Sequence, residues 1–417
     1  MNIKNDRPMN HETDALYLLI GGNPLPNAAA ALALLSSSGT PYLIHTKQTQ
    51  LQAQRLATAL AVAKPSLKPA QLINLGDNQA EASIIASQIR ASAQTLQGSI
   101  GLNYTGGNKA MSVHAYRAIS QLHPNAIFSY LDSQTQEIII DNNDRKSDRL
   151  KCTIPLSFDA LFALHGLQWR KDLTPVETAT LPIAAAQLAH HHQNELLHRA
   201  WRKWCEQTLK AKTQTNQYKP TWLSESQLET IAPISIQSLP RDLKQWCQTY
   251  LDANATQLSL QVAKTKGFQS ITQLCEWLNG IWMENHVLAE IERIADTNKI
   301  HDRGMSFHIQ DPNRIQSADK FESDVAFMQS YHLFYFSCTT SADHKLCKQK
   351  LMEAKTRAQQ LGGTEARIAL VCCSDYPDRL RDELDIASSK THQRKDPKIK
   401  VFGRQDLNQL GNRMTKW

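Results

Sequence analysis

The sequence predicts an α/β protein with two sheet domains and a helical region between them. Three observations lead to this prediction. Short apolar runs alternate with helical patterns over residues 15–141, a long helical pattern covers residues 181–209, and residues 267–410 give the order helix, strand hairpin, helix, strand. We expect a doubly wound, largely parallel sheet at residues 1–145, a helical middle region at 146–262 and a second α/β domain at 263–417.

The length, the net charge and the cysteine spacing of the chain limit which classes of protein it can belong to. The 417 residues exceed a usual single domain, and a formal charge of +7 permits a polyanionic partner without requiring one. The eight cysteines form no CxxC pair and no Cys/His spacing suited to zinc. No long apolar run follows the N-terminus, so we expect no signal peptide, no membrane span and a cytoplasmic location.

The first domain is predicted from its periodicity. A continuous apolar run at residues 15–20 is typical of a buried parallel strand, and similar runs recur along the domain. Strands are expected at 15–20, 41–45, 71–76 and 99–103, helices at 26–37, 51–62, 80–97 and 110–119, and a closing hairpin at 126–131 and 137–141.

The motif Asn-Tyr-Thr-Gly-Gly-Asn-Lys at residues 103–109 lies between a predicted strand and a predicted helix. Two glycines allow the backbone to approach an anion, and the free N–H groups of the helix would point at it beside the lysine. The alternative is a tight turn with a surface lysine. The loop at residues 21–24, Gly-Gly-Asn-Pro, should meet this motif beyond the carboxyl ends of the strands, where such sheets bind ligands.

Two common nucleotide sites do not match. The first loop lacks the GxGxxG spacing of dinucleotide-binding folds, and His45 and Thr46 stand where an acidic residue would end the second strand. The motif at residues 106–109 is not a GxxxxGK sequence followed by serine or threonine, which excludes a P-loop.

A doubly wound domain with a strand-to-helix "TGG-x-K" motif resembles the CRISPR-associated CARF domains, over residues 14–145. The resemblance implies a homodimer that binds a cyclic oligoadenylate, with cyclic tetra-adenylate as the expected ring, because a ring of repeated nucleotides suits a two-fold axis. The family usually has threonine or serine before the lysine, and Asn108 stands there with an amide that can still bond a phosphate or ribose. The implied ligand contacts are Gly22, Asn23, Asn103, Thr105, Gly106, Gly107, Asn108 and Lys109.

The middle region offers little chemistry. His190, His191 and His192 are adjacent on a predicted helix and cannot all face one metal, so we interpret them as a solvated helix edge. Trp201 and Trp204 repeat at helical spacing, together with Cys205, and we interpret the three as core or dimer packing.

The last part of the chain carries a second resemblance. A helix at 280–291, strands at 322–328 and 331–338, a helix at 345–361 and a strand at 366–373 are predicted. Their order resembles the restriction-endonuclease-like domain with a PD-(D/E)xK core that follows CARF sensors in CRISPR ancillary nucleases. The resemblance implies Asp324 and Glu284 as catalytic residues and as ligands of Mg²⁺ or Mn²⁺.

The Glu-x-Lys part of that motif is replaced by Ser337-Cys338-Thr339. Ser337 cannot match a carboxylate as a ligand of Mg²⁺, and Thr339 supplies no cation. A lysine on the following helix is one substitute, and the alternative is that this helix simply presents a basic, solvated face. The candidate lysines are Lys345, Lys348 and Lys355.

Two further features are open to two interpretations each. Glu322 would share a strand face with Asp324 and restore a carboxylate, or it is a solvated strand end. The basic run at residues 394–400 either touches a nucleic-acid backbone or is an exposed basic loop.

These observations lead to a hypothesis and two alternatives. The first is a cyclic-oligoadenylate sensor in type III CRISPR antiviral defence that controls a metal-dependent nuclease domain acting on DNA or RNA. The second is a non-catalytic effector, switched by the same ligand, in which a degenerate nuclease domain binds nucleic acid or a partner. The third, cleavage of the cyclic ligand by the N-terminal domain itself, stays open.

Overall fold

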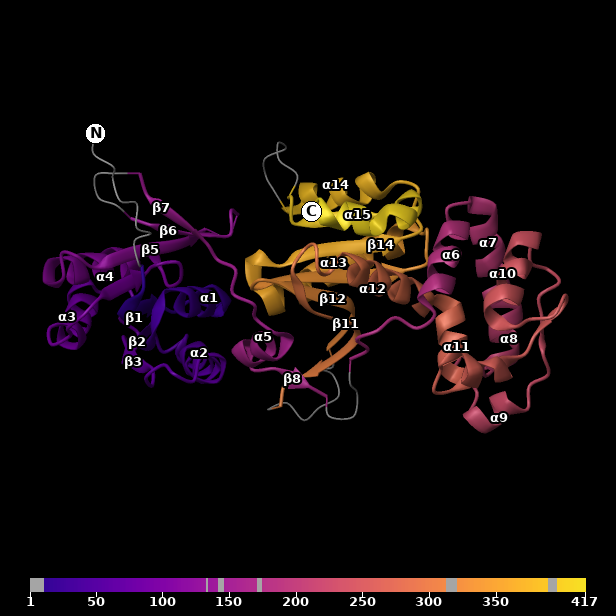
Figure 1. Ribbon diagram of the computed structural model, residues 1–417, viewed down its shortest axis with the longest axis horizontal. Coiled ribbons are helices and arrows are strands. Elements are labelled where there is room, and N and C mark those ends of the chain that lie inside the picture. The colour runs from indigo at the N-terminus through magenta and orange to yellow at the C-terminus, as the bar shows by residue number, and fades with distance from the viewer. Residues whose placement is uncertain (1–10, 133, 142–145, 171–174, 313–320, 389–395) are drawn as a thin grey trace, which may run out of the picture.

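The computed structural model describes residues 11–132, 134–141, 146–170, 175–312, 321–388 and 396–417. The molecule is elongated, and three bodies follow one another along its long axis (Figure 1). The N-terminal sheet domain, in indigo, lies at one end, and the helical region lies at the other. The C-terminal sheet domain, orange to yellow, lies between them, so the order in space differs from the order in sequence.

The N-terminal domain is the predicted doubly wound sheet. Its described strands are β1 (Thr13–Leu19), β2 (Leu35–His45), β3 (Gln71–Asn74), β4 (Ile100–Asn103), β5 (Ile127–Asp132), β6 (Glu137–Ile140) and β7 (Asp148–Lys151). They lie in the order β3-β2-β1-β4-β5-β6-β7, parallel from β1 to β5 and antiparallel at β6 and β7. The helices are α1 (Leu25–Leu34), α2 (Gln50–Ala63), α3 (Ala82–Ala93) and α4 (Lys109–Leu122).

Both faces of this sheet are buried because every side chain of β1 from Ala15 onwards is apolar. Leu16 and Leu18 pack in one core with α1 and α2, whereas Tyr17 and Leu19 pack in another with α3 and α4. Helices cover the two faces, as a parallel sheet requires. The sheet runs on to β7, past the boundary expected at residue 145.

The C-terminal domain contains a mixed sheet in the order β15-β14-β13-β12-β11-β8. The strands are β8 (Gln168–Trp169), β11 (Ile300–Gln310), β12 (Phe321–Gln329), β13 (His332–Thr339), β14 (Arg367–Cys372) and β15 (Ile399–Phe402). The helices are α5 (Phe158–His165), α12 (Trp282–Ile294), α13 (His344–Gly362), α14 (Pro377–Ser388) and α15 (Leu410–Thr415). β13, β14 and β15 are parallel, and β11, β12 and β13 pair antiparallel. The sequence pattern did not predict β11.

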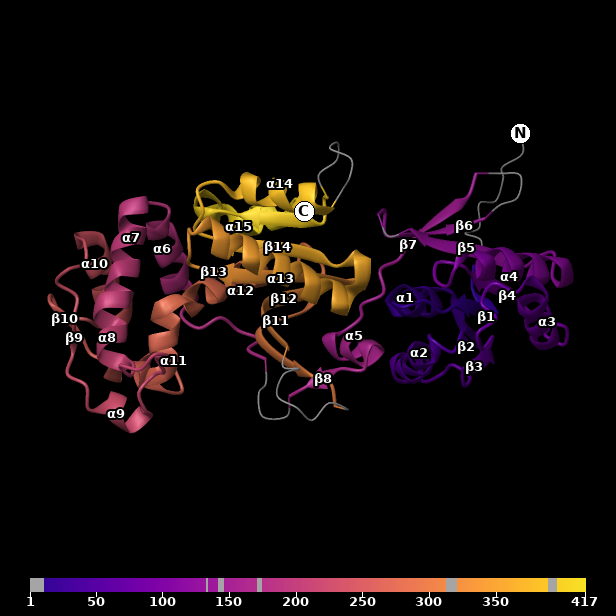
Figure 2. The ribbon, with the colours of Figure 1, turned by 180° about the vertical axis from the view of Figure 1, so that it is seen from behind.

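One hydrophobic core joins the two sheet domains. It contains Leu56 of α2, Phe158 of α5 and Leu351 of α13. The domains are therefore packed against each other rather than linked by a free connector, and Figure 2 shows α5 between α2 and the C-terminal sheet.

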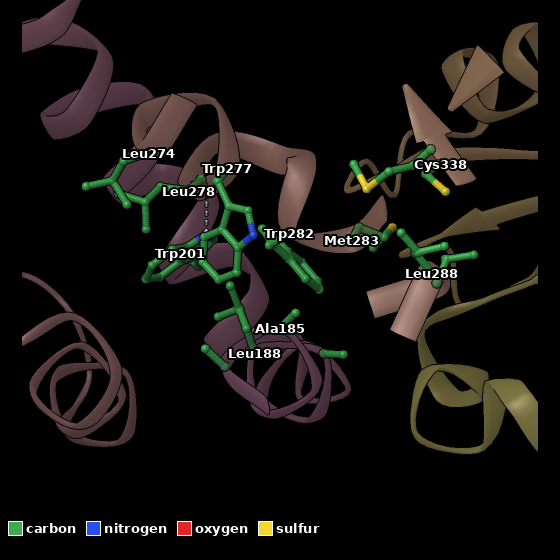
Figure 3. Close-up of a cluster of buried hydrophobic side chains, with 14 of the residues drawn as sticks. Ala185, Leu188, Trp201, Leu274, Trp277, Leu278, Trp282, Met283, Leu288 and Cys338 are labelled. Carbon is green, nitrogen blue, oxygen red and sulfur yellow. Dashed lines mark hydrogen bonds between the residues drawn. The ribbon is translucent and has the colours of Figure 1, made fainter. Parts of the chain in front are cut away.

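The helical region is built around buried tryptophans. Its described elements are α6 (Pro182–His192), α7 (Glu195–Trp204), α8 (Lys210–Thr213), α9 (Glu225–Glu229), α10 (Arg241–Leu251), α11 (Ile271–Glu276) and the short strands β9 (Ile234–Ser235) and β10 (Gln257–Leu258). Figure 3 shows Trp201 and Trp277 beside Leu278, where the indole Nε1 of Trp201 donates to the Leu278 carbonyl at 3.2 Å. Trp201, Trp204 and Cys205 all belong to this core, as predicted.

The interpretation of the histidine run as a solvated edge is wrong for His192. His192 is fully buried, its Nδ1 lies 2.8 Å from the Leu188 carbonyl, and its ring lies against Trp282. Only His190 is exposed. Across the described residues, no helix combines the length and the apolar composition that a membrane crossing needs.

Candidate functional site

The glycine motif forms the turn between β4 and α4, and it packs on the end of β1. A Cβ on Gly106 would lie 2.1 Å from the Leu19 carbonyl oxygen. Gly107 has φ +71°, and a Cβ there would lie 2.9 Å from Cβ of Leu19. Only glycine fits at either position. Packing against β1 is thus sufficient to explain both glycines, whatever the turn binds.

Two residues of the motif hold the turn in place. Asn103 is fully buried, its Nδ2 donates to Oγ of Ser129 at 3.1 Å, and its Oδ1 accepts from the Thr105 N–H at 3.3 Å. Oγ1 of Thr105 accepts from the Leu131 N–H at 2.7 Å. The structure therefore gives Asn103 an anchoring position, and this residue does not line the pocket described below.

Asn108 is the N-cap of α4. Its Oδ1 accepts from the Met111 N–H at 2.9 Å, and its Nδ2 donates to the Gln79 carbonyl at 3.1 Å. Both polar groups of the amide are already bonded within the protein, as is common for an N-cap residue. Lys109 begins α4, is exposed, and forms no hydrogen bond or ion pair with any other residue that the structure describes. Its ammonium group therefore lies free at the positive end of the helix.

A pocket of about 340 Å³ opens beside this turn. Its lining comprises Gly21, Gly22, Asn23, Pro26, Thr105, Gly106, Gly107, Tyr130 and Leu131 of the N-terminal domain, and Tyr331, Thr364 and Glu365 of the C-terminal domain. The sequence identified Gly22, Asn23, Thr105, Gly106 and Gly107 of this set. The contribution of the C-terminal domain was missed, because no local signal in the sequence relates two segments that far apart.

The C-terminal wall of this pocket, Tyr331 and Glu365, is polar and buried. Glu365 is 7% exposed, its Oε1 accepts from Oγ1 of Thr364 at 2.9 Å, and its Oε2 lies 3.7 Å from Nζ of Lys398. Neither Oε2 of Glu365 nor the hydroxyl of Tyr331 has a hydrogen-bond partner among the described residues. No lining residue is cationic. The pocket therefore suits the uncharged, hydrogen-bonding part of a ligand better than a phosphate.

Asp324 lies on β12 opposite the replaced Glu-x-Lys motif. Its Oδ2 accepts hydrogen bonds from Oγ of Ser337 at 3.0 Å and from the Cys338 N–H at 2.6 Å. Thr339 ends β13, and its Oγ1 accepts from the Ser341 N–H at 3.2 Å. The strand pair thus brings the expected residues together, with serine as a donor to the aspartate.

The electrostatic surroundings of Cys338, beside Asp324, also include Glu284 and a lysine that sequence analysis missed. Burial raises the pKa of the Cys338 thiol well above its usual value, the Asp324 and Glu284 carboxylates raise it further, and Lys350 opposes them. Glu284, which comes from α12, and Lys350, which comes from α13, therefore both act on the end of β13. Lys350 lies five residues past Lys345 along the basic helix.

The other charged residues that the sequence suggested for this site have different surroundings in the structure. Nζ of Lys348 lies 2.9 Å from Glu383, and Lys345 is exposed. The backbone of Glu322 pairs with His308, but its side chain lies outside the described residues. Residues 394 and 395 of the basic run also lie outside them. Lys398 of that run donates to the Thr364 carbonyl at 2.6 Å, so the described part of the run belongs to the fold.

A divalent metal fits this site only in part. In the described ranges, no three His, Cys, Asp or Glu side chains are grouped to hold a metal. Mg²⁺ bound by one or two carboxylates keeps several waters, and Asp324 with Glu284 would supply such a pair. One oxygen of Asp324 is, however, already bonded by two donors.

The chain folds into a doubly wound, Rossmann-like sheet domain packed against a mixed-sheet α/β domain, and the helical region is inserted in sequence within the second domain, after β8. No protein-family model and no curated protein matches the sequence. Solved structures do match its fold. The crystal structure of protein VC1899 from Vibrio cholerae is 17% identical with a TM-score of 0.66, covering 97% of each chain.

The fold also matches Can2 from Sulfobacillus thermosulfidooxidans in complex with cyclic tetra-adenylate. That match has 17% identity and a TM-score of 0.65, over 97% of this chain and 99% of Can2. A type III CRISPR defence DNA nuclease activated by cyclic oligoadenylate matches at 15% identity and a TM-score of 0.50, over 88% of this chain and 46% of the nuclease. The resemblance to CARF-domain nucleases is thereby confirmed at the level of the fold.

Proposed function

We propose that this protein is a cyclic-oligoadenylate sensor of type III CRISPR antiviral defence, and that the ligand controls its C-terminal nuclease-like domain. The observation that carries the proposal is the pocket at the glycine turn, because both domains line it. A ligand held there contacts the sensor and the effector at once. The likeness of the fold to Can2, whose structure contains cyclic tetra-adenylate, supports the same ligand class.

The chemistry of the site divides the ligand into two parts. Phosphates suit the N-terminus of α4, where Lys109 adds a free positive charge. A nucleoside suits the pocket, where Oε2 of Glu365 can accept from an amino or hydroxyl group and the Tyr331 hydroxyl can donate. In this arrangement the ring lies across the glycine turn.

A homodimer follows from the size of the site. The pocket volume of about 340 Å³ is at the lower end for a small-molecule site and is too small for a ring of four nucleotides. Two copies of the chain related by a two-fold axis would each hold half of cyclic tetra-adenylate. The second copy supplies the same residues to the other half.

For the effector domain, ligand-controlled binding of nucleic acid without cleavage is the better supported function. Ser337 replaces a carboxylate and Thr339 replaces the lysine of the motif, and Asp324 is bonded by Ser337. These residues retain the strand pair of a nuclease but lack its charges. The partner that this domain would bind is a nucleic acid, either DNA or RNA.

Metal-dependent cleavage is the second candidate, and one observation favours it. The charges of Asp324, Glu284 and Lys350 all influence the pKa of Cys338, so two carboxylates and a cation belong to the surroundings of that thiol. Asp324 and Glu284 would hold Mg²⁺ or Mn²⁺, which supplies Lewis-acid stabilisation of a phosphoryl group when bound. Lys350 would then take the place of the motif lysine.

One experiment separates these functions. Labelled single-stranded DNA and RNA are incubated with the protein and Mn²⁺, with and without cyclic tetra-adenylate, and both mobility shifts and cleavage products are measured. We expect a ligand-dependent shift without cleavage. Ligand-dependent cleavage that is lost in Asp324→Ala would establish the nuclease instead. Chromatography of the same mixtures for linear oligoadenylates tests whether the N-terminal domain opens the ring.

A further inference from the structure

A second pocket, of about 520 Å³, lies where the helical region meets the C-terminal sheet. Segments that follow three parallel strands line it: His344 comes after β13, Asp375 after β14 and Arg404 after β15. α7 supplies His198 and Arg199 to the same lining, and Figure 1 shows this helix at the end of the sheet that these strands reach. The carboxyl ends of parallel strands are where open α/β sheets bind ligands.

Arg404 is the buried cation of this pocket. It is 2% exposed, and its Nε and Nη2 donate to the Cys373 carbonyl at 3.3 and 3.1 Å. Nη2 also lies 3.0 Å from Oδ2 of Asp375. Nη1 has no hydrogen-bond partner in the part of the chain that the structure describes. A buried guanidinium N–H without an acceptor costs free energy, so an acceptor from outside the chain would stabilise it.

His198 provides a second unsatisfied group. It is 5% exposed, and its Nδ1 also lacks a partner among the described residues. Burial, and then the positive charges of Arg404, Arg202 and Arg199, lower the pKa of His198 to about 4. The imidazole is therefore neutral at physiological pH, and it lies in a positive electrostatic potential.

The rim of the pocket is charged and aromatic. Arg199 and Arg379 have side chains that are 73% and 72% exposed, and each is paired with a glutamate on its own helix. Such surface pairs contribute little and can be exchanged for a stronger acceptor. Tyr376 is 73% exposed and presents an aromatic ring at the same rim. Exposed aromatic rings beside arginines are suited to stacking a base.

We propose that this pocket binds the phosphate group of a nucleotide, with Arg404 and His198 at its base, Arg199 and Arg379 at its rim and the base against Tyr376. Each of the three arginines has a carboxylate partner within the chain, Glu195 for Arg199, Glu383 for Arg379 and Asp375 for Arg404, and a phosphate would take the place of the exposed partners at the rim. The phosphate belongs either to a free nucleotide or to a nucleic-acid strand. The strand case rests on the proposed function and is therefore measured with and without cyclic tetra-adenylate, whereas the free-nucleotide case does not depend on the N-terminal ligand.

Isothermal titration of the full-length protein with AMP, with adenosine and with inorganic phosphate tests the pocket directly. Fluorescence anisotropy with a labelled single-stranded oligonucleotide tests the strand case. The double variant Arg199→Gln with Arg379→Gln removes the two positive charges of the rim. It should fold, because both side chains are exposed. Arg413→Gln is the matched control, because Arg413 is 52% exposed, pairs with Asp406 at 2.9 Å and lies outside the pocket.

We expect the double variant to weaken binding about tenfold or more, while Arg413→Gln changes it little. Arg404→Gln, checked for folding by its melting temperature, should lose binding altogether. Rim-dependent binding of AMP but not of the oligonucleotide assigns the site to a free nucleotide, and rim-dependent binding of the oligonucleotide assigns it to a strand. The proposal that this pocket binds a phosphate would be contradicted if the double variant and the control bind equally well. It would also be contradicted if the wild type binds none of the probes.

Binding of cyclic tetra-adenylate serves as the internal reference. It should be unchanged in the double variant, because Arg199 and Arg379 belong to the other end of the C-terminal sheet. A failure of cyclic tetra-adenylate binding in the wild type would contradict the proposed function and leave the phosphate measurements standing.

Discussion

The hydroxyl of Ser337 donates a hydrogen bond to Oδ2 of Asp324 across two neighbouring strands, at 3.0 Å. In the nuclease motif that this strand pair resembles, a carboxylate would stand at the position of Ser337. The donor turns a pair of metal ligands into a hydrogen-bonded pair that needs no metal.

Restoring both motif residues should therefore create activity. In Ser337→Glu with Thr339→Lys, the new carboxylate joins Asp324 and Glu284 around a cation, and the lysine supplies the missing charge. We expect Mn²⁺-dependent cleavage of labelled nucleic acid that the wild type lacks. Ser337→Gln with Thr339→Lys is the matched control, because it has the same size without the carboxylate, and it should stay inactive. An inactive but folded Glu-Lys variant would mean that the rest of the site has been lost.

The two glycine loops should respond differently to the same small change. Gly106→Ala places a Cβ 2.1 Å from the Leu19 carbonyl, so we expect a loss of stability of about 2–3 kcal/mol and a lower melting temperature. A Cβ on Gly22 meets nothing within 4 Å, so Gly22→Ala should melt like the wild type. Because Gly22 lines the pocket, the same variant should bind cyclic tetra-adenylate more weakly. Wild-type affinity in Gly22→Ala would remove the first loop from the ligand site.

The C-terminal wall of the pocket should contribute to ligand affinity. Glu365→Ala removes an acceptor and Tyr331→Phe removes a hydroxyl, and neither Oε2 of Glu365 nor the Tyr331 hydroxyl has a hydrogen-bond partner within the described residues. We expect each variant to weaken cyclic tetra-adenylate binding by about tenfold in calorimetry. Glu365→Gln keeps an acceptor and should lose less. If all three variants bind like the wild type, the ligand does not reach the C-terminal domain.

His332 should make the protein less stable in acid. Burial, followed by the charges of Arg367 and Lys398, lowers the pKa of His332 from 6.5 to about 3. Between these values the unfolded chain binds a proton that the folded chain excludes, so the free energy of unfolding falls as the pH is lowered from about 6.5 towards 3. His332→Leu should flatten that part of the curve of melting temperature against pH. An unchanged curve would show that His332 is protonated in the folded protein.

The sequence predicted the first domain well because a parallel sheet is buried on both faces. Its strands are continuous apolar runs, as at residues 15–20, and its helices have clear spacing. β11 was missed for the opposite reason. It carries Asp302 and Arg303, its pairing with β12 shifts near Ile300, and Ser306 has φ +57°, so neither its composition nor its alternation is regular.

The candidate site was predicted in part. The glycine turn and the first loop were found because local chain geometry determines them. Asn108 was offered to a ligand, although asparagine before a helix is a common N-cap. Tyr331, Glu365 and Arg404 were not found, because their positions depend on the packing of segments distant in sequence. The end of a strand and the start of a helix can be inferred locally, whereas the opposite wall of a pocket cannot.

The most direct test of the sensor is calorimetric titration of cyclic tetra-adenylate into three proteins: wild type, Lys109→Ala and Lys68→Ala. Lys109 lies at the positive end of α4 without a described partner. Lys68 is also exposed, but it precedes the edge strand β3, whereas Lys109 follows the central strand β4. We predict saturable binding by wild type and Lys68→Ala, and a loss of about tenfold or more in Lys109→Ala. No binding by the wild type, or equal affinity in all three proteins, would contradict the account.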